Sequence, residues 1–354
     1  MRVSEVLSGR DNNFNLIRML AAFGVIVSHS YPLTRGPKSY QPEFGDLAVD
    51  VFFVISGFLV TRSLMTRQDT WSFARARILR IYPALWVMLC LVVFVLGPAV
   101  SSVSFLHYFA ARMTYGYLAK DAILFSGINY SLPGVFTANA FPQAVNGSLW
   151  TLYYEVRLYM SLALVWMILK LLPDKRLYLF PQFILAAVAI SLTIRLVLVA
   201  HGETNSEWSR LATYFLFGSA MYVLRDRIIL SWISFAGLVV ALGVAAYFGG
   251  QIFVLGRILL LGWLTLHFAY LPQGWIRQYN RLGDYSYGLY IYAFPVQQTI
   301  DHFYPQITVP AMLASASIAT VILAMLSWHW IEKPALSRRT LRQRRPPTFD
   351  KPPI

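Results

Sequence analysis

The stretch LIRMLAAFGVIVSHS, residues 16–30, decides the fold class, because it is largely apolar and has the periodicity of a helix. The apolar run around it starts near Phe14 and extends for about 20 residues, enough to cross a bilayer core. It is longer than the core of a signal peptide and no small-residue cleavage site follows it, so we predict a retained first span. Within it lie Arg18 and His29, which are costly in lipid and therefore usually functional.

The whole chain has the composition of a membrane protein. Of its 354 residues, 57% are hydrophobic and 13% are charged, whereas a soluble domain carries roughly 25% charged residues. We predict an all-α, polytopic transmembrane helical bundle of about ten spans, over residues 14–33, 47–66, 78–98, 149–171, 177–200, 211–224, 231–248, 252–271, 284–303 and 309–331. Residues 99–148 are expected to hold re-entrant or interfacial helix, for example around Phe105–Met113.

Lysine and arginine are divided unevenly between alternate loops. One set of loops, which includes both termini, holds 21 of these residues, and the opposite set holds five. Because basic residues remain on the cytoplasmic side, both termini are predicted to be cytoplasmic. The net charge of +14 follows this topology, so no nucleic-acid partner is expected. After a transmembrane domain of residues 1–337, the basic, proline-rich tail of residues 338–354 is expected to contact the membrane surface.

Cysteine and histidine use excludes two classes of site. Cys90 is the single cysteine, so neither an intramolecular disulfide nor a cysteine-rich metal site can form. The six histidines are scattered without a ligand-like spacing, and we predict no metal.

Arg18 and His29 are predicted to share one helix face. Eleven residues turn an α-helix through close to three full turns and advance it by roughly 16 Å. The predicted orientation places Arg18 near the cytoplasmic end of the first span and His29 near its outer end. The two residues are too far apart to pair, and they mark the two ends of one polar track.

Other intramembrane polar residues extend this division. Asp50 and Glu155 lie in the outer half, with Asp46 one turn before Asp50, and Ser148 and Tyr159 fall on a face similar to that of Glu155. The cytoplasmic half has three arginines at the start of the third span, Arg75, Arg77 and Arg80. An arginine cluster can hold a phosphorylated carrier, and a histidine with carboxylates can take a proton from a nucleophile.

Each of these residues also has a purely structural interpretation. Arg77 and Arg80 could be anchors at the cytoplasmic surface, and Asp46 could cap the second predicted helix. A lone histidine such as His29 could form an interhelical hydrogen bond. Glu155 is the hardest to explain in this way, because a buried carboxylate needs a partner.

Six motifs in order resemble the acyltransferase-3 family of bacterial integral-membrane acyltransferases, across nearly the whole chain. They are NLIRMLAAFGVIVSH, VDVFFVISGFL, FARARILRIYP, NGSLWTLYYEVRLY, YSYGLYIYAFPV and HWIEKP. The form NGSLWTLYYE is similar to the branch that acts on exported polysaccharides. The chain departs from the family at Ala76 and Ala293, where many members have a basic residue and a histidine. The SGNH hydrolase-like domain of longer members is expected to be absent, which indicates a stand-alone form.

The resemblance implies a function and a role for each candidate residue. The donor would be cytoplasmic acyl-CoA, and the reaction would be O-acylation, most often acetylation, of a sugar hydroxyl on the outer side of the bacterial inner membrane. His29 would be the catalytic base or carry the acyl group, and Glu155 would orient or activate His29 or bind the acceptor. From its place in the outer half, we also predict Asp50 as a catalytic residue. The remaining residues would bind donor (Arg18, Arg75, Arg77 and Arg80) or glycan acceptor (Asn146, Ser148, Trp150, Tyr153 and Tyr159).

Two other classes of function compete with an enzyme. A proton-coupled transporter or exporter could use His29, Asp50 and Glu155 as a proton relay, although the chain has no inverted repeat of the kind found in many transporters. A scaffold subunit of a polysaccharide export complex would need only structural polar contacts. The sequence does not indicate the acceptor or the oligomeric state.

Overall fold

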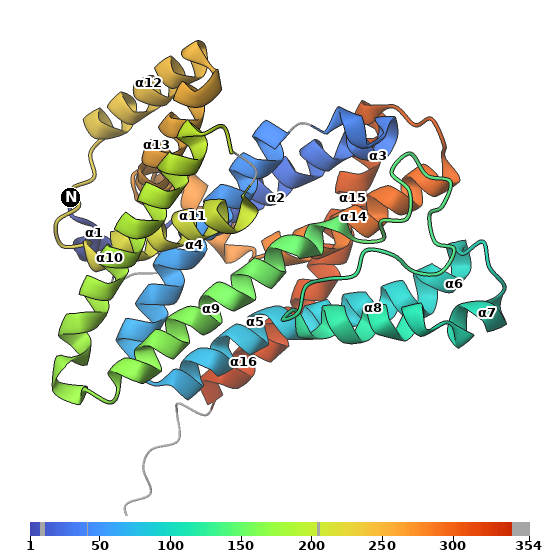
Figure 1. The fold of residues 1–354 in the computed structure, drawn as a ribbon, viewed down its shortest axis with the longest axis horizontal. Coiled ribbons are helices and arrows are strands. Elements are labelled where there is room, and N and C mark those ends of the chain that lie inside the picture. The colour runs from blue at the N-terminus through green and yellow to red at the C-terminus, as the bar shows by residue number, and fades with distance from the viewer. Residues whose placement is uncertain (8–10, 41, 204–205, 342–354) are drawn as a thin grey trace, which may run out of the picture.

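The computed structural model describes residues 1–7, 11–40, 42–203 and 206–341, and over these residues the chain is helical without a strand (Figure 1). The α-helices are α1 (Val3–Val6), α2 (Phe14–Ser30), α3 (Pro32–Arg35), α4 (Pro42–Arg67), α5 (Thr70–Leu91), α6 (Gly97–Val100), α7 (Phe105–Ala110), α8 (Arg112–Ile123), α9 (Trp150–Leu169), α10 (Pro173–Ala200), α11 (Glu207–Val223), α12 (Trp232–Phe248), α13 (Gly250–Tyr270), α14 (Ser286–Phe303), α15 (Val309–Ser327) and α16 (Lys333–Leu341). The predicted all-α class is confirmed for this part of the chain.

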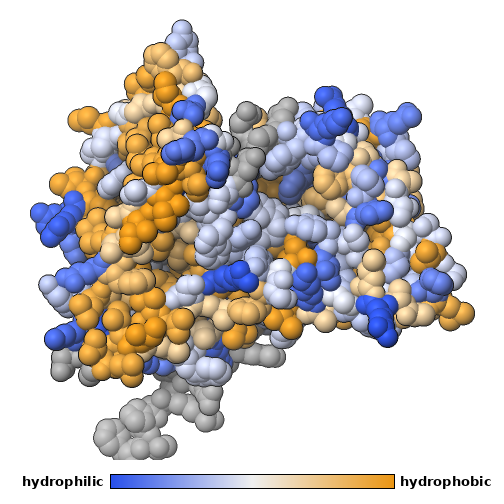
Figure 2. Space-filling view, viewed as in Figure 1, coloured by the Kyte–Doolittle hydropathy of each residue, from blue (hydrophilic) through white to orange (hydrophobic). Residues whose placement is uncertain are grey.

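Seven helical segments are long and apolar enough to cross a membrane, and they correspond to seven of the ten predicted spans. They are Phe14–Arg35, Phe44–Arg67, Thr70–Val100, Gly147–Leu169, Lys175–Ala200, Gly250–Tyr270 and Val309–Ser337. The other three predicted spans are also helices, α11, α12 and α14. The first two have 17 residues each, and α14 has 18 but is not apolar enough to be counted among the seven. The count of ten spans and the cytoplasmic termini stay predictions. Figure 2 shows apolar side chains gathered over α10, α12 and α13.

Two glycines bring α4 and α11 into close contact. A Cβ atom on Gly57 would lie 1.8 Å from the backbone oxygen of Phe215, and one on Gly218 would lie 2.0 Å from that of Val54. Only glycine allows two backbones to approach so closely. Gly57 of the SGFL motif and Gly218 of α11 therefore serve helix packing.

The region 99–148 holds the short helices α7 and α8 and then a loop that returns to α14 (Figure 1). Asn139 donates to the Gln298 side-chain oxygen over 2.7 Å, and Gln298 donates to the backbone oxygens of Phe141 and Ala144 over 2.7 Å each. These bonds satisfy buried polar groups and fix the loop that leads into α9.

The predicted tail lies largely outside the described residues. Its first part, residues 338–341, continues α16, and residues 342–354 lie outside.

Candidate active site

A cavity of about 280 Å³ lies among α2, α4, α5, α9 and α14. Five of the predicted site residues line it: Arg18, Arg77, Arg80, Glu155 and Tyr159. Arg77 and Arg80, three residues apart on α5, both reach this cavity. Arg75, two residues before Arg77, does not line it.

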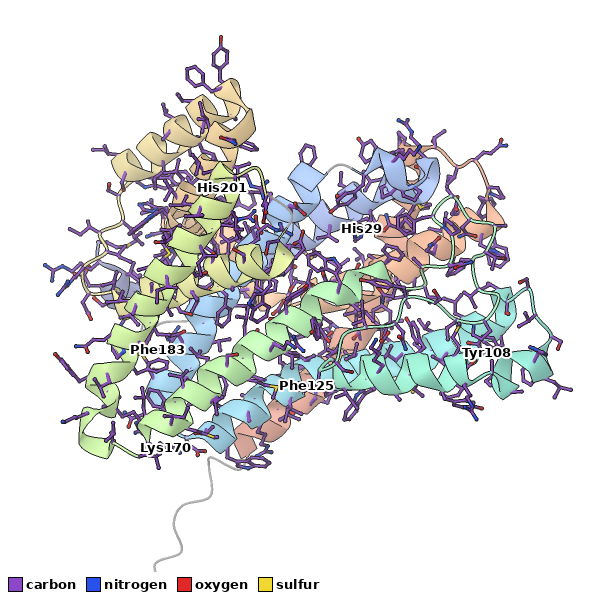
Figure 3. All side chains as sticks on the ribbon, viewed as in Figure 1. His29, Tyr108, Phe125, Lys170, Phe183 and His201 are labelled. Carbon is purple, nitrogen blue, oxygen red and sulfur yellow. The ribbon has the colours of Figure 1, made fainter. Side chains whose placement is uncertain are left out.

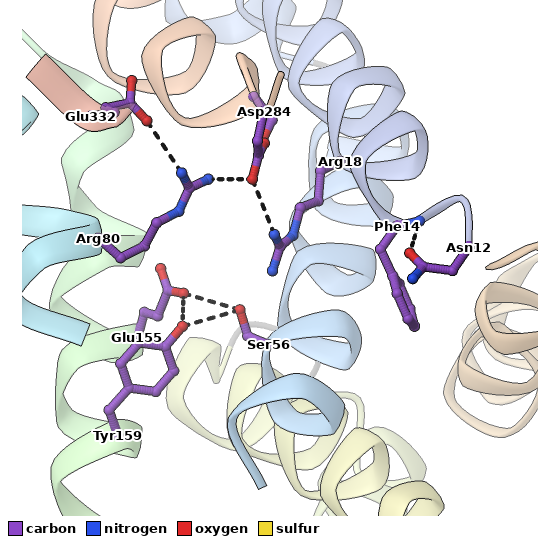
Figure 4. Close-up of polar contacts among 10 residues, drawn as sticks. Asn12, Phe14, Arg18, Ser56, Arg80, Glu155, Tyr159, Asp284 and Glu332 are labelled. Carbon is purple, nitrogen blue, oxygen red and sulfur yellow. Dashed lines mark hydrogen bonds and ion pairs between the residues drawn. The ribbon is translucent and has the colours of Figure 1, made fainter. Parts of the chain in front are cut away.

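Two carboxylates from distant parts of the chain hold the arginines of the cavity (Figure 4). Asp284 Oδ2 lies 2.6 Å from Arg80 Nη2 and 3.3 Å from Arg18 Nη1. Glu332 Oε2 lies 3.3 Å from Arg80 Nη1. The guanidinium of Arg80 also lies 5.6 Å from the ring centroid of Tyr287. Charged groups out of water need such partners, and the network fixes the positions of two cations.

Asp284 and Glu332 are the functional candidates that the sequence reasoning missed. Both stood inside or beside motifs that were quoted, YSYGLYIYAFPV and HWIEKP. The sequence could have indicated them, because three arginines predicted near one end of the bundle need acidic partners.

Arg77 is placed differently from the other two arginines. It is in no ion pair among the described residues, and its Nε atom is buried without a hydrogen-bond partner there. Its guanidinium lies 5.7 Å from the ring centroid of Tyr159. It interacts with the Tyr159 hydroxyl and with the charge of Glu155, but no carboxylate among the described residues forms an ion pair with it, so an anion in the cavity can.

Glu155 is bound within the cavity by two hydroxyl groups (Figure 4). The Tyr159 hydroxyl donates to Glu155 Oε1 in a short hydrogen bond. Ser56 Oγ donates to the same oxygen over 3.0 Å and lies 3.3 Å from the Tyr159 hydroxyl. These two hydroxyl groups are the partners that a carboxylate removed from water needs. Because Ser56 belongs to α4 and Glu155 to α9, the bond between them also joins the two helices.

His29 lies near the end of α2 and does not line the cavity. Its ring packs edge-on against Phe294 of α14, with ring centroids 5.2 Å apart, and its Nδ1 atom is buried without a hydrogen-bond partner among the described residues. Figure 3 labels it within the bundle, apart from His201, which is exposed at the end of α10. No hydrogen bond joins His29 to Glu155 in the described structure, so a direct orienting contact between them is not seen.

Asp50 does not join the predicted cluster with His29 and Glu155. Its carboxylate is fully buried and is bound by Arg210 Nη1 at 2.9 Å and Arg257 Nη2 at 2.6 Å. Asp46 lies inside α4 rather than at its N-terminus, and it pairs with Arg210 at 3.4 Å, so the expectation that it caps the helix is wrong. Asp50 pairs with arginines of α11 and α13 because a buried carboxylate needs charge compensation.

Asn146 positions the start of α9 on α14. Pro295 has no N–H and cannot bond the backbone oxygen of Ile291 one turn earlier, and Asn146 Nδ2 donates to that oxygen over 2.9 Å. Asn146 Oδ1 accepts from the backbone N–H of Ser148 over 3.1 Å. Asn146 is fully buried, and both ends of its amide are in use, so it acts as a positioning residue rather than as a ligand for an acceptor.

The other predicted acceptor residues lie around this turn. Ser148 is fully buried, and its Oγ has no hydrogen-bond partner among the described residues. Trp150 packs against the ring of Tyr154, and Tyr153 lies 4.2 Å under the guanidinium of Arg157. Neither Trp150 nor Tyr153 lines the cavity, and their binding roles stay predictions.

A family model described as an acyltransferase domain matches residues 11–329. The chain belongs to the acyltransferase-3 family. It is 29% identical to the O-acetyl transferase of Shigella phage Sf6, covering 93% of this chain and 97% of that protein. It is 29% identical to Nodulation protein 10 of Rhizobium leguminosarum bv. viciae, covering 95% and 96% of the two chains.

A third relative of this acyltransferase is peptidoglycan O-acetyltransferase OatA of Listeria monocytogenes, which is 26% identical over 90% of this chain and 54% of that protein. No solved structure matches the chain. Family membership and the apolar helices together support an integral-membrane O-acyltransferase. The proton relay of the transporter interpretation would need Asp50 close to Glu155. Asp50 is instead bound by two arginines away from the cavity that Glu155 lines, which argues against that relay.

Within the acyltransferase, the site separates into two chemical regions. The cavity offers guanidinium groups that suit phosphate, with Glu155 and Tyr159 along its wall. His29 lies beyond it, on the same helix as Arg18. For the described residues, no group of three or more histidine, cysteine or acidic residues could hold a metal ion.

Proposed function

We propose that this acyltransferase takes an acyl group, normally acetyl, from cytoplasmic acyl-CoA and transfers it to a sugar hydroxyl on the outer side of the bacterial inner membrane. The acceptor is an exported or cell-envelope glycan, such as an exopolysaccharide or a lipopolysaccharide. The names of two relatives, an O-acetyl transferase and a peptidoglycan O-acetyltransferase, support this chemistry.

The observation that carries the proposal is the convergence of three arginines on one cavity. Arg18, Arg77 and Arg80 come from two helices and face the same space. Guanidinium groups bind phosphate oxygens in a planar, two-point geometry. The phosphates of CoA bind here, meeting the free charge of Arg77 first and then exchanging with Asp284 at Arg18 and Arg80.

The acyl thioester then lies toward His29. Arg18 and His29 are both on α2, roughly 16 Å apart along the helix axis, and the pantetheine arm of CoA spans a distance of this order. His29 accepts the proton of the attacking sugar hydroxyl as general base. The sugar oxygen bonds to the acyl carbon, the thioester C–S bond breaks, and the proton held by His29 passes to the sulfur so that CoA leaves as the thiol. Glu155, hydrogen-bonded to Tyr159 and Ser56, supports the path between the two ends.

A vesicle experiment tests donor, acceptor and orientation together. Everted membrane vesicles that contain the protein are given radiolabelled acetyl-CoA on the outside, and label is followed into alkali-labile esters of envelope glycan. We expect transfer in everted vesicles and none in sealed right-side-out vesicles, because acetyl-CoA then meets only the periplasmic face. Equal transfer from both sides would contradict a cytoplasmic donor site.

Two substitutions separate donor binding from chemistry. Arg80→Gln should weaken acetyl-CoA binding, while Arg157→Gln, outside the cavity, should not. His29→Ala should abolish transfer but retain donor binding, while exposed His201→Ala is the control. A folded His29→Ala protein with full transfer would refute the assigned base. Unchanged CoA affinity in a less stable Arg80→Gln protein would instead support the anchor interpretation.

A further inference from the structure

One aromatic ring separates the donor cavity from His29. Tyr290 of α14 lines the cavity, whereas Phe294, one turn later on the same face of the helix, does not. The Phe294 ring contacts the His29 ring edge-on, with centroids 5.2 Å apart and an interplanar angle of 80°. The cavity therefore reaches Tyr290 but not Phe294, the next residue on that helix face, whose ring covers His29.

The same ring also contacts the turn that begins the NGSLW motif. A Cβ atom on Gly147 would lie 2.5 Å from Phe294 Cε2, so the ring can occupy its place only because residue 147 is glycine. Phe141 packs against the ring from a third direction, with centroids 6.2 Å apart. Phe294 thus fills the space between His29 and the Gly147–Ser148 turn.

Two residues at these contacts have polar atoms without partners: His29, which touches the Phe294 ring, and Ser148, which follows Gly147 in the chain. His29 Nδ1 and Ser148 Oγ are both buried, and neither has a hydrogen-bond partner among the described residues. Ser148 is fully buried. Buried polar atoms are nearly always paired in folded proteins, so an unpartnered imidazole nitrogen beside Phe294 and an unpartnered hydroxyl in the turn that the ring contacts point to a ligand that carries a polar atom.

We propose that the space filled by Phe294 is the subsite for the acyl group of the donor. When acyl-CoA binds, the ring moves aside and the acyl group takes its place between His29 and Ser148. Ser148 Oγ donates a hydrogen bond to the acyl carbonyl oxygen, and the limited volume restricts the site to short acyl chains. This inference rests on the proposed function, since it takes acyl-CoA as the ligand.

Stable ketone analogues of acyl-CoA test the subsite without a known acceptor. In these analogues a methylene replaces the thioester sulfur, and the ketone carries a methyl or a propyl group. For the wild-type protein we expect the methyl ketone to bind at least about tenfold more tightly than the propyl ketone, because a pocket rejects methylenes that do not fit. In Phe294→Ala this preference should fall to about threefold or less.

A second pair of ligands tests the role of Ser148. Ser148→Ala should weaken the methyl ketone roughly two- to tenfold, the effect of one lost hydrogen bond. It should leave unchanged the affinity for the matching alkyl analogue that lacks the carbonyl. An equal loss for both ligands would show that Ser148 acts only through packing, and would overturn this part of the proposal.

Controls make the outcomes distinct. Phe180 is as buried as Phe294 but packs against Trp166 on α9, so Phe180→Ala removes the same volume and should keep the wild-type preference. Phe294→Leu, which retains more apolar contact, replaces Phe294→Ala if that variant does not fold. If the analogues bind but the Phe294 variants keep the wild-type ranking, the subsite is refuted and donor binding stands. If no analogue binds any variant, the proposed donor and the subsite both fail.

Discussion

Removing the charge of Asp50 tests whether this carboxylate holds the bundle together or takes part in acyl transfer. The side chain is fully buried, and its oxygens are bound by Arg210 at 2.9 Å and by Arg257 at 2.6 Å. We expect Asp50→Asn to lower the free energy of unfolding by about 3–5 kcal/mol, the range found when one partner of a buried ion pair is removed. The transfer activity of each folded molecule should persist.

The structure indicates where most of this loss arises. Arg210 keeps two other carboxylates, Asp46 at 3.4 Å and Glu207 at 2.5 Å. Arg257 has no second carboxylate among the described residues, so Asp50→Asn leaves its charge buried and unpaired. The double variant Asp50→Asn/Arg257→Gln should therefore lose less than the two single variants combined, with a coupling energy of about 1.5–3 kcal/mol, as for a hydrogen bond to a charged group.

The assay combines equilibrium unfolding in detergent with acetyl transfer per folded molecule. Asp226→Asn is the control, because its pair with Arg225 is exposed and spans 3.8 Å, and it should change stability by no more than about 0.5 kcal/mol. The reasoning is refuted if Asp50→Asn leaves the free energy of unfolding within about 1 kcal/mol of wild type while transfer is lost, because Asp50 would then act in the chemistry.

Three further perturbations have defined outcomes. Gly57→Ala should destabilise the protein by at least about 1–3 kcal/mol in the same unfolding assay, because its Cβ would lie 1.8 Å from the Phe215 backbone oxygen; a neutral effect would contradict the close contact. Asn146→Ala should cost about 1–3 kcal/mol by leaving the Ile291 oxygen unpaired, and unchanged thermal stability would contradict the positioning role. Burial raises the pKa of Asp121, outside the seven candidate spans, to about 7. The proton it holds in the folded state therefore adds stability at low pH that is lost between about pH 4 and 7, and Asp121→Asn should remove that slope in unfolding measured from pH 5 to pH 8.

The sequence predicts well what depends on local pattern. Apolar runs of membrane-spanning length predicted the seven apolar helical segments, because hydropathy is read from residues that are neighbours in the chain. The eleven-residue interval between Arg18 and His29 correctly placed both on one helix, α2. Hydropathy alone does not account for α14, which is not among the seven apolar candidate spans. The helix is rich in tyrosine and glutamine, and its burial among other helices, rather than its hydropathy, accounts for its place.

Contacts between residues far apart in the chain could not be predicted from the sequence. Asp50 is separated by 160 positions from Arg210 and by 207 from Arg257. A single chain indicates that a buried carboxylate needs a cation, but not which of 30 lysines and arginines supplies it. The same reason explains why Asp284 was missed, although Arg18 and Arg80 required a counter-charge.

The bridge from Asp284 to Arg18 and Arg80 has a consequence for turnover. A phosphate that binds Arg18 or Arg80 must compete with Asp284, which lies 3.3 Å from the first guanidinium and 2.6 Å from the second. On the proposed function, spent CoA keeps the phosphates of the donor, and it must leave before the next cycle. We therefore expect the return of Asp284 to the two guanidinium groups to help displace those phosphates, which would limit product inhibition at the cost of some donor affinity.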